Sequence, residues 1–191
     1  RQEPGEGLGV SMRLASALLA LAFVAGGAWA QTKPRPPKIL PGDLMELKTR
    51  DGWTLSARYL PAKDDRTTFI LLHGAGGRKE DWYYLARVMK ARGYGMLALD
   101  LRGHGASQAA PEGQPAHYRK FAVSKGYNEW SNMTIDVEAA VAHLTGLGLA
   151  PTTIALGGSD VGSSIALRYA AVHAQVPMVF MLSPGMSYRD V

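Results

Sequence analysis

Three glycine-rich turns, each placed directly after a short apolar run, constrain the fold of this chain most strongly. They lie at residues 73–77, 100–107 and 157–162. The apolar runs before them, at residues 67–72, 94–99 and 152–156, have the length of buried strands. Segments with helical spacing separate these runs. This alternation predicts an α/β protein with a mostly parallel sheet and helices on both faces.

The elements around this pattern extend the prediction. Residues 44–50 and 53–60 alternate partly between apolar and polar side chains, and Asp51 and Gly52 between them favour a turn, so the domain should open with an antiparallel hairpin. Residues 106–129 show no clear period, and a segment of this length after a strand is expected to line a ligand site. We also expect helices at residues 80–92, 132–147 and 162–174, and a fourth parallel strand at 178–182.

The N-terminal region has the features of an export signal. Met12 and Arg13 precede an apolar run at residues 14–25, and the small-residue pattern AWA follows at 28–30. The run is shorter than the roughly 20 residues that span a bilayer. We predict a leader at 1–11, a signal peptide at 12–30, a proline-rich linker at 31–42 and the folded domain at 43–191, in a secreted or periplasmic protein. A retained membrane anchor is the alternative.

Composition excludes several classes of function. The 191 residues suit a single domain, and the net charge of +5 is spread over the chain without a basic run, which argues against nucleic-acid binding. The chain has no cysteine, so disulfides, thiolate metal sites and a cysteine nucleophile are excluded. Neither a metal-binding cluster nor a phosphate-binding or dinucleotide-binding glycine pattern is present, and we expect no metal and no cofactor.

The three turns resemble the motifs of the α/β-hydrolase superfamily. HGAGG at residues 73–77 is similar to the oxyanion turn of that family, DLRGHGAS at 100–107 to the end of its next strand, and residues 157–162 to its nucleophile elbow. IALRYAA and LSPG further along are similar to an esterase-like branch. The resemblance covers residues 44–191 and implies an α/β-hydrolase fold. It also implies a domain incomplete at the C-terminus, since the family's catalytic acid and histidine come later in its sequence.

The elbow can be matched to the family pattern G-x-nucleophile-x-G in two ways. With Ser159 as the nucleophile, the second flanking position is Val161, a β-branched residue where the tight turn leaves no room for a Cβ atom. With Asp160, both flanking positions are glycine, Gly158 and Gly162. Counting back without a gap from the IAL of the following helix also places aspartate at the nucleophile position. The residues favour Asp160, and Ser159 remains the alternative.

The resemblance assigns roles around this position. If Asp160 is the nucleophile, the backbone N–H groups of Val161 and Ala75 are the implied oxyanion donors; if Ser159 is, the N–H of Asp160 replaces that of Val161. A carboxylate with a pKa of about 4 needs no base to be nucleophilic. Haloalkane dehalogenases and epoxide hydrolases of the superfamily use an aspartate here, usually followed by tryptophan where this chain has valine.

None of the histidines matches the family's catalytic base. His73 and His104 lie in tight turns and are expected to be structural, and His117, His143 and His173 lie where the motifs give them no role. The leading hypothesis is an exported hydrolase that acts on ester or related bonds of a small-molecule substrate. The alternatives are an enzyme with an aspartate nucleophile, similar to epoxide hydrolases or dehalogenases, and a non-catalytic binding or structural module.

Overall fold

The computed structural model describes residues 39–123 and 128–185. The expected leader and signal peptide, and the linker as far as residue 38, lie outside the described residues. Within them, the side chain of Leu40 is buried against the core, and Arg58 donates a hydrogen bond to the carbonyl oxygen of Gly42 at 2.6 Å. The described chain is therefore packed against the domain from Leu40 onward.

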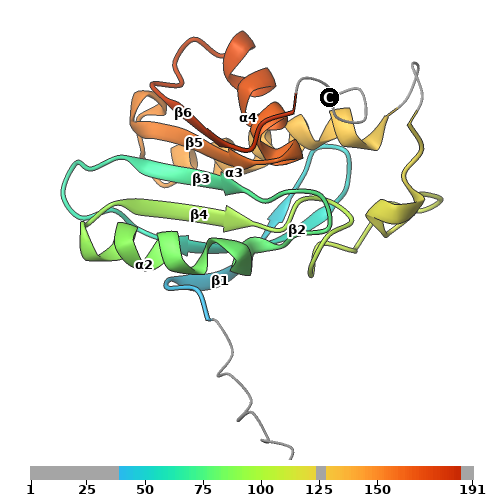
Figure 1. Ribbon diagram of the computed structural model, residues 1–191, viewed down its shortest axis with the longest axis horizontal. Helices are drawn as coiled ribbons and strands as arrows, with labels where there is room; N and C mark the ends of the chain where they lie inside the picture. The colour runs from blue at the N-terminus through green and yellow to red at the C-terminus, as the bar shows by residue number, and fades with distance from the viewer. Residues whose placement is uncertain (1–38, 124–127, 186–191) are drawn as a thin grey trace, which may run out of the picture. The chain divides into compact units, whose positions relative to one another are not determined.

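A six-stranded sheet in the order β1-β2-β4-β3-β5-β6 forms the centre of the domain (Figure 1). β3 to β6 run parallel, β2 is antiparallel to β4, and β1 is antiparallel to β2. This arrangement confirms the predicted fold class, a mostly parallel sheet that opens with an antiparallel hairpin. The strands are β1 (Asp43–Lys48), β2 (Thr54–Leu60), β3 (Thr68–Leu72), β4 (Gly95–Leu99), β5 (Ile154–Ser159) and β6 (Val179–Leu182).

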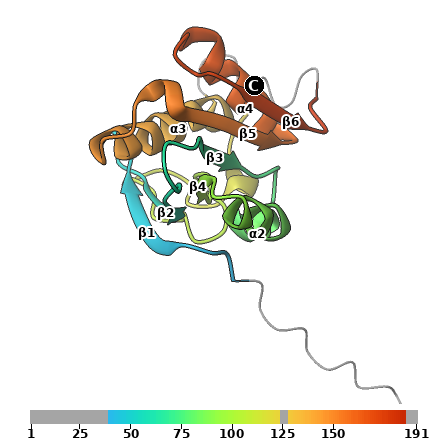
Figure 2. The same cartoon turned by 90° about the vertical axis from the view of Figure 1, so that its left-hand side faces the viewer.

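Helices cover both faces of the sheet, as the alternating pattern predicts (Figure 2). Alternate residues of each inner strand face opposite sides, so that Ile70 and Leu72 pack with α3 and α4 while Phe69 and Leu71 pack with α2. The helices are α2 (Tyr83–Ala91), α3 (Glu129–Gly146) and α4 (Val161–Val172), with 3-10 turns η1 (Lys79–Trp82), η2 (Tyr118–Lys120) and η3 (Pro151–Thr153). In the described part of the chain, no helix is both long and apolar enough to cross a membrane.

Several boundaries differ from the sequence prediction. β5 extends to Ser159 and so includes Gly157 and Gly158 of the expected turn. The hairpin loop spans residues 49–53, because Lys48 pairs with Thr54 and the N–H of Trp53 donates to the hydroxyl of Thr49 at 2.8 Å instead of joining the strand. Helix α3 begins at Glu129 rather than near residue 132, because the side chain of Asn128 caps it by accepting from the N–H of Trp130 at 3.0 Å. A capping residue therefore ends the irregular segment.

The strand order brings two of the glycine turns together. β3 lies between β4 and β5, so the chain moves to one side of β3 and then crosses back to the other. Such a reversal opens a crevice at the carboxyl ends of parallel strands, where α/β sheets bind ligands. The turn after β3 at residues 73–77 and the elbow after β5 therefore lie next to each other.

Candidate active site at the strand-end turns

Asp160 occupies the sharp turn between β5 and α4. Its backbone has φ 51° and ψ −123°, whereas Ser159 is the last residue of the strand. A non-glycine residue with positive φ is strained, and such strain persists only where the surrounding structure imposes it. Strain of this kind is concentrated at functional sites, so the backbone itself marks residue 160 as a candidate.

The flanking glycines explain why the turn is centred on Asp160. A Cβ atom on Gly158 would lie 2.2 Å from the carbonyl oxygen of Gly162, and one on Gly162 would lie 2.3 Å from the carbonyl oxygen of Leu72. Both contacts are with backbone atoms that cannot move aside. The glycines on either side of residue 160 are therefore required for the close approach of α4 to the sheet. The catalytic role of Asp160 remains a prediction.

The Asp160 side chain points toward the turn after β3. The N–H of Ala75 donates to Oδ2 of Asp160 at 3.1 Å, and the missing side chain of Gly74 leaves the space that Asp160 Cβ fills. Asp160 is partly exposed, and in the described part of the chain no donor contacts its Oδ1. One carboxylate oxygen is thus fixed by a backbone donor while the other is open to a ligand.

Of the two predicted oxyanion donors, Ala75 contacts this carboxylate through its backbone N–H, and Val161 directly follows Asp160 in the chain. Val161 is the first residue of α4, and the N–H groups of a first helical turn have no acceptor within the helix. Its side chain is fully buried in the core, so its backbone N–H is the group it could offer to a ligand. Both predicted oxyanion donors are therefore backbone groups, one in the turn after β3 and one at the start of α4, and their role remains a prediction.

The end of β6 supports the elbow in a way the sequence does not reveal. The carbonyl oxygen of Leu182 accepts from the N–H of Asp160 at 2.9 Å and from the hydroxyl of Ser163 at 3.1 Å. The strained turn is thus tied to the neighbouring strand. The only sequence signal for these contacts is the position of LSPG at the end of the next apolar run.

The turn at residues 100–107, called here the brace turn, carries buried charges that are fully paired. Asp100 accepts from the N–H of Lys79 at 2.7 Å, from its ammonium group at 2.7 Å and from the N–H of Ala106 at 2.8 Å. Ser107 donates to the carbonyl oxygen of Asp100 and accepts from the N–H of Ser56. These bonds join β2, β4 and η1, which is a structural role.

Arg102 is the centre of the brace turn and is completely buried. Its guanidinium group contacts Asp136 and Asp51 at 2.8 and 2.6 Å and Glu129 at 3.0 Å. Burial raises the pKa of Asp136 to about 6 against the opposing effect of Arg102. Burial by itself raises the pKa of Asp51. The hydrogen bonds from Arg102 and Thr49 lower that pKa by more than burial raises it, so it lies below its usual range. The cluster joins the hairpin loop, β4 and α3.

Both buried histidines hold backbone groups, as expected for a structural role, and Nε2 of His104 is buried without a hydrogen-bond partner among the described residues. The Nε2 atom of His73 accepts from the N–H of Leu101 at 3.0 Å, so Nδ1 carries the proton and donates to the carbonyl oxygen of Gly74 at 2.7 Å. His104 donates from Nδ1 to the carbonyl oxygen of Arg102 at 2.9 Å. Burial lowers the pKa of His73, and it lowers that of His104 to about 4. Both rings are therefore neutral near pH 7.

The irregular segment contributes one aromatic residue that sequence reasoning missed. Tyr118 stacks on the ring of His104, with centroids 4.2 Å apart and planes at 11°. Its hydroxyl lies 2.9 Å from the position that a Cβ atom on Gly76 would take, beside the oxyanion turn. No motif spacing pointed to this residue, because its position depends on how the loop folds back over the brace turn.

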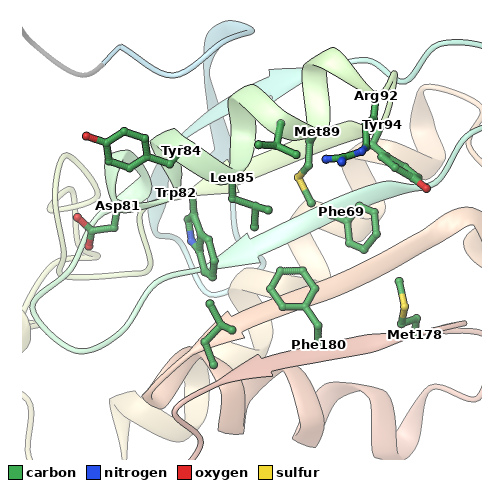
Figure 3. Close-up of a pocket in the computed structure, with 12 residues that line it drawn as sticks. Phe69, Asp81, Trp82, Tyr84, Leu85, Met89, Arg92, Tyr94, Met178 and Phe180 are labelled. Carbon is green, nitrogen blue, oxygen red and sulfur yellow. The ribbon is translucent and has the colours of Figure 1, made fainter.

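The large apolar groove of the domain does not include the elbow. It has a volume of about 650 Å³ and lies on the α2 face of the sheet, where Trp82, Leu85 and Met89 face Phe69 and Phe180 (Figure 3). None of the strand-end residues around Asp160 lines it except Leu182. In residues 39–123 and 128–185, no cluster of His, Cys, Asp or Glu is arranged to hold a metal ion.

A family model described as the α/β-hydrolase fold matches residues 67–190. This range contains all three glycine turns, including the strained turn at Asp160. The chain belongs to the α/β-hydrolase superfamily. No curated protein matches it in sequence. The assignment fits the observed sheet, in which the oxyanion-like turn follows β3 and the strained turn follows β5.

Solved structures of low sequence identity to the chain agree with it in fold. An α/β-hydrolase from Penicillium sp. sh18 is 24% identical with a TM-score of 0.63, over 78% of this chain and 47% of that one. An esterase from Exiguobacterium antarcticum is 20% identical with a TM-score of 0.57, over 76% and 48%. An epoxide hydrolase from Vigna radiata is 20% identical with a TM-score of 0.56, over 76% and 39%. The chain thus spans about half the length of the first two, and these identities support the fold alone.

Proposed function

We propose that this α/β-hydrolase is an exported enzyme in which Asp160 attacks an electrophilic carbon of a small-molecule substrate. The observation that carries the proposal is the Asp160 carboxylate, held at a strained turn with Oδ2 on the N–H of Ala75 and Oδ1 open. Export rests on the signal-peptide pattern at residues 12–30 and is part of the proposal.

The chemistry follows from the two oxygens of the carboxylate. The hydrogen bond from Ala75 fixes the side chain, so that Oδ1 can attack without rotating away. Attack on saturated carbon forms an ester between Asp160 and the substrate, and the leaving group departs with the bonding electrons. Water then hydrolyses the ester at the carboxyl carbon. In this mechanism the N–H groups of Ala75, which contacts Oδ2, and of Val161 stabilise the oxyanion of that second step.

A serine mechanism at Ser159 is less well supported. Ser159 belongs to β5, its backbone is not at the strained position, and the two required glycines flank its neighbour instead. In addition, the Asp160 carboxylate already occupies the Ala75 donor that a serine mechanism would need for its own oxyanion. The geometry therefore favours alkyl transfer to Asp160 over acyl transfer to Ser159.

Covalent labelling tests the proposal directly. The 191-residue chain is incubated with styrene oxide and followed by intact-mass spectrometry, with peptide mapping to locate the adduct. Opening the epoxide adds its whole mass, because the ring oxygen takes a proton from water. We expect labelling at Asp160 that is lost in Asp160→Ala and kept in Ser159→Ala, the matched neighbour.

The other outcomes are equally informative. Labelling that depends on Ser159 and not on Asp160 would reverse the assignment of the nucleophile. A folded chain that gives no Asp160-dependent adduct with epoxides, alkyl bromides or p-nitrophenyl esters would contradict the proposal and favour a non-catalytic binding module.

A further inference from the structure

We propose that a cavity at the amino ends of the parallel strands binds a small organic ammonium ion through the hydroxyl of Thr68 and the carboxylates of Asp64 and Asp65. The cavity, called here the amino-end cavity, has a volume of about 370 Å³, within the range of small-molecule sites. β3 starts at Thr68, and the turn that contacts Asp160 follows the other end of the strand (Figure 1). The site is therefore separate from the proposed nucleophile and does not depend on it.

Three segments that are distant in sequence form the walls of the amino-end cavity. They are the end of β2 with the loop at residues 61–66, the start of β3, and the loop at residues 148–153 that follows α3. Tyr59 and Leu149 supply apolar surface, whereas the side chains of Thr68 and of the 61–66 loop supply oxygen atoms. An apolar wall with a few polar groups is typical of a site for a small molecule.

The hydroxyl of Thr68 is a buried group that the fold leaves without a partner. Thr68 is completely buried and lines the cavity, and its Oγ1 atom has no hydrogen-bond partner in residues 39–123 and 128–185. Oγ1 borders the space left by the missing side chain of Gly95, because a Cβ atom there would clash with Oγ1 and lie 2.8 Å from the backbone nitrogen of Ala62, another lining residue. A buried hydroxyl is unfavourable unless a partner completes it. A ligand in the cavity supplies that partner.

The carboxyl end of α3 lies beside the amino-end cavity. The helix runs for 18 residues to Gly146, and residues 148–150, which follow it, line the cavity. Carbonyl groups without partners give the C-terminus of a helix a partial negative charge, which favours cations. His143 is the basic residue of the last turn of α3, and neither lysine nor arginine occurs there. The end of the helix therefore favours a positively charged ligand.

Asp64 and Asp65 add two formal negative charges at the cavity. Both are exposed, and neither forms an ion pair among the residues that the structure describes. Arg66 also lines the cavity, but its guanidinium group lies over the ring of Tyr94, 5.4 Å from the ring centre. The carboxylates are thus available to a ligand, and they attract a cation and repel an anion.

An alkylammonium ion matches these groups in charge and in hydrogen bonding. Its three N–H donors can bond to Oγ1 of Thr68 and to the carboxylate oxygens, while its alkyl chain lies against Tyr59 and Leu149. An alcohol of the same length lacks the charge, and tetramethylammonium keeps the charge but has no N–H donor. These two compounds therefore separate the contribution of charge from that of hydrogen bonding.

Titration of the 191-residue chain with n-butylammonium chloride, followed by NMR of the backbone amides, tests the proposal. We expect saturable shifts at residues 62–66 and 148–150, with an affinity at least about tenfold higher than for 1-butanol or tetramethylammonium. Because Asp64 and Asp65 are exposed, the affinity should fall as sodium chloride is added. Replacing both carboxylates, by Asp64→Asn with Asp65→Asn, should lower it about threefold or more.

Thr68→Val tests the buried hydroxyl. The change keeps the shape of the side chain and should lower the affinity for n-butylammonium by about 10- to 100-fold, the effect of losing a hydrogen bond to a charged group. It should not lower the melting temperature, because it removes a hydroxyl that the fold leaves without a partner. Thr134→Val is the matched control, since the Thr134 hydroxyl donates within α3 to the carbonyl oxygen of Ser131. Its affinity should be unchanged.

Each remaining outcome overturns the proposal. Equal affinity for n-butylammonium and 1-butanol would show that charge plays no part. Unchanged affinity in Thr68→Val would show that the hydroxyl does not bind the ammonium group, and a lowered melting temperature would make that hydroxyl structural. Absence of saturable shifts would remove the site altogether. None of these results bears on labelling at Asp160, so the proposed function stands or falls separately.

Discussion

The elbow and the brace turn are both glycine-rich segments that follow a parallel strand, but the charged residues of the two turns lie in opposite environments. In the brace turn, Arg102 is completely buried and contacts three carboxylates. At the elbow, Asp160 is strained and partly exposed, and one of its oxygens is open. The same sequence signal thus supports stability in one place and leaves a carboxylate oxygen without a donor in the other, where we propose the nucleophile. The difference is whether the fold itself satisfies the charge.

The largest effect is expected from removing the buried cation. Arg102→Met leaves Asp51, Glu129 and Asp136 close together without their counterion, and we expect a loss of about 4 kcal/mol in the free energy of unfolding. Arg50→Met is the control, because Arg50 forms an exposed ion pair with Glu138 at 2.7 Å and its loss should barely change stability. Urea unfolding followed by circular dichroism measures both. Equal effects of the two changes would remove the contrast between the turns.

The steric requirement at the elbow predicts the next effect. Gly162→Ala places a Cβ atom 2.3 Å from the backbone oxygen of Leu72, so α4 must move away from the sheet. We expect a loss of about 2–3 kcal/mol by the same unfolding measurement. Gly146→Ala is the matched control, because a Cβ atom there meets nothing within 4 Å at the end of α3, and it should be neutral or slightly stabilising. If Gly162→Ala left the free energy of unfolding unchanged, α4 could move away from the sheet at little cost, and the close approach would not be required.

Acid should weaken the brace turn through its histidine. The folded pKa of His104 is lowered to about 4, so the ring stays neutral in the fold while the unfolded chain takes up a proton below pH 6.5. The stabilisation is therefore complete above pH 6.5 and is lost as the pH falls toward 4, by at most about 3 kcal/mol. Asp136, with its pKa raised to about 6, opposes this loss because the folded state binds its proton first.

Unfolding measured from pH 7.5 to 4.5 tests this titration. His104→Gln keeps a donor for the carbonyl oxygen of Arg102 but does not titrate, so its stability should fall less steeply over that range. If the unfolding free energy changes with pH equally in both proteins, then His104 takes up its proton in the folded chain over the same pH range as in the unfolded chain. The NMR titration of the His104 ring in the unsubstituted chain reports the same pKa independently.

The smallest effect has the opposite sign and sharpens the comparison most. Asp160→Gly relieves the positive φ at the elbow while losing the bond from Ala75, and we expect a net gain of about 1 kcal/mol. Labelling by styrene oxide should disappear at the same time. A rise in melting temperature with loss of labelling would mark Asp160 as a residue kept for chemistry. A fall in melting temperature would show that its contacts stabilise the turn.

Prediction from the sequence succeeded where the cause is local. Apolar runs and helical spacing predicted the succession of strands and helices along the chain. The clash expected at Val161 favoured Asp160 as the centre of the turn, and the strained backbone lies at that residue. Prediction was less accurate where distant groups decide, as at the hairpin loop, which is longer than Asp51 and Gly52 suggest because the buried Trp53 leaves the strand pairing. The early start of α3 depends on a single capping residue that lay inside a segment without a clear pattern.

The sequence by itself determined the class of fold, and it favoured Asp160 over Ser159 as the residue at the centre of the elbow. Both follow from steric and hydrophobic rules that act between near neighbours in the chain. Only the tertiary structure decided that Arg102 gathers Asp51, Glu129 and Asp136, and that Tyr118 stands beside the turn of Ala75. These partners are far apart in sequence. Their pairing depends on burial and on the crossing of strands, which no local pattern encodes.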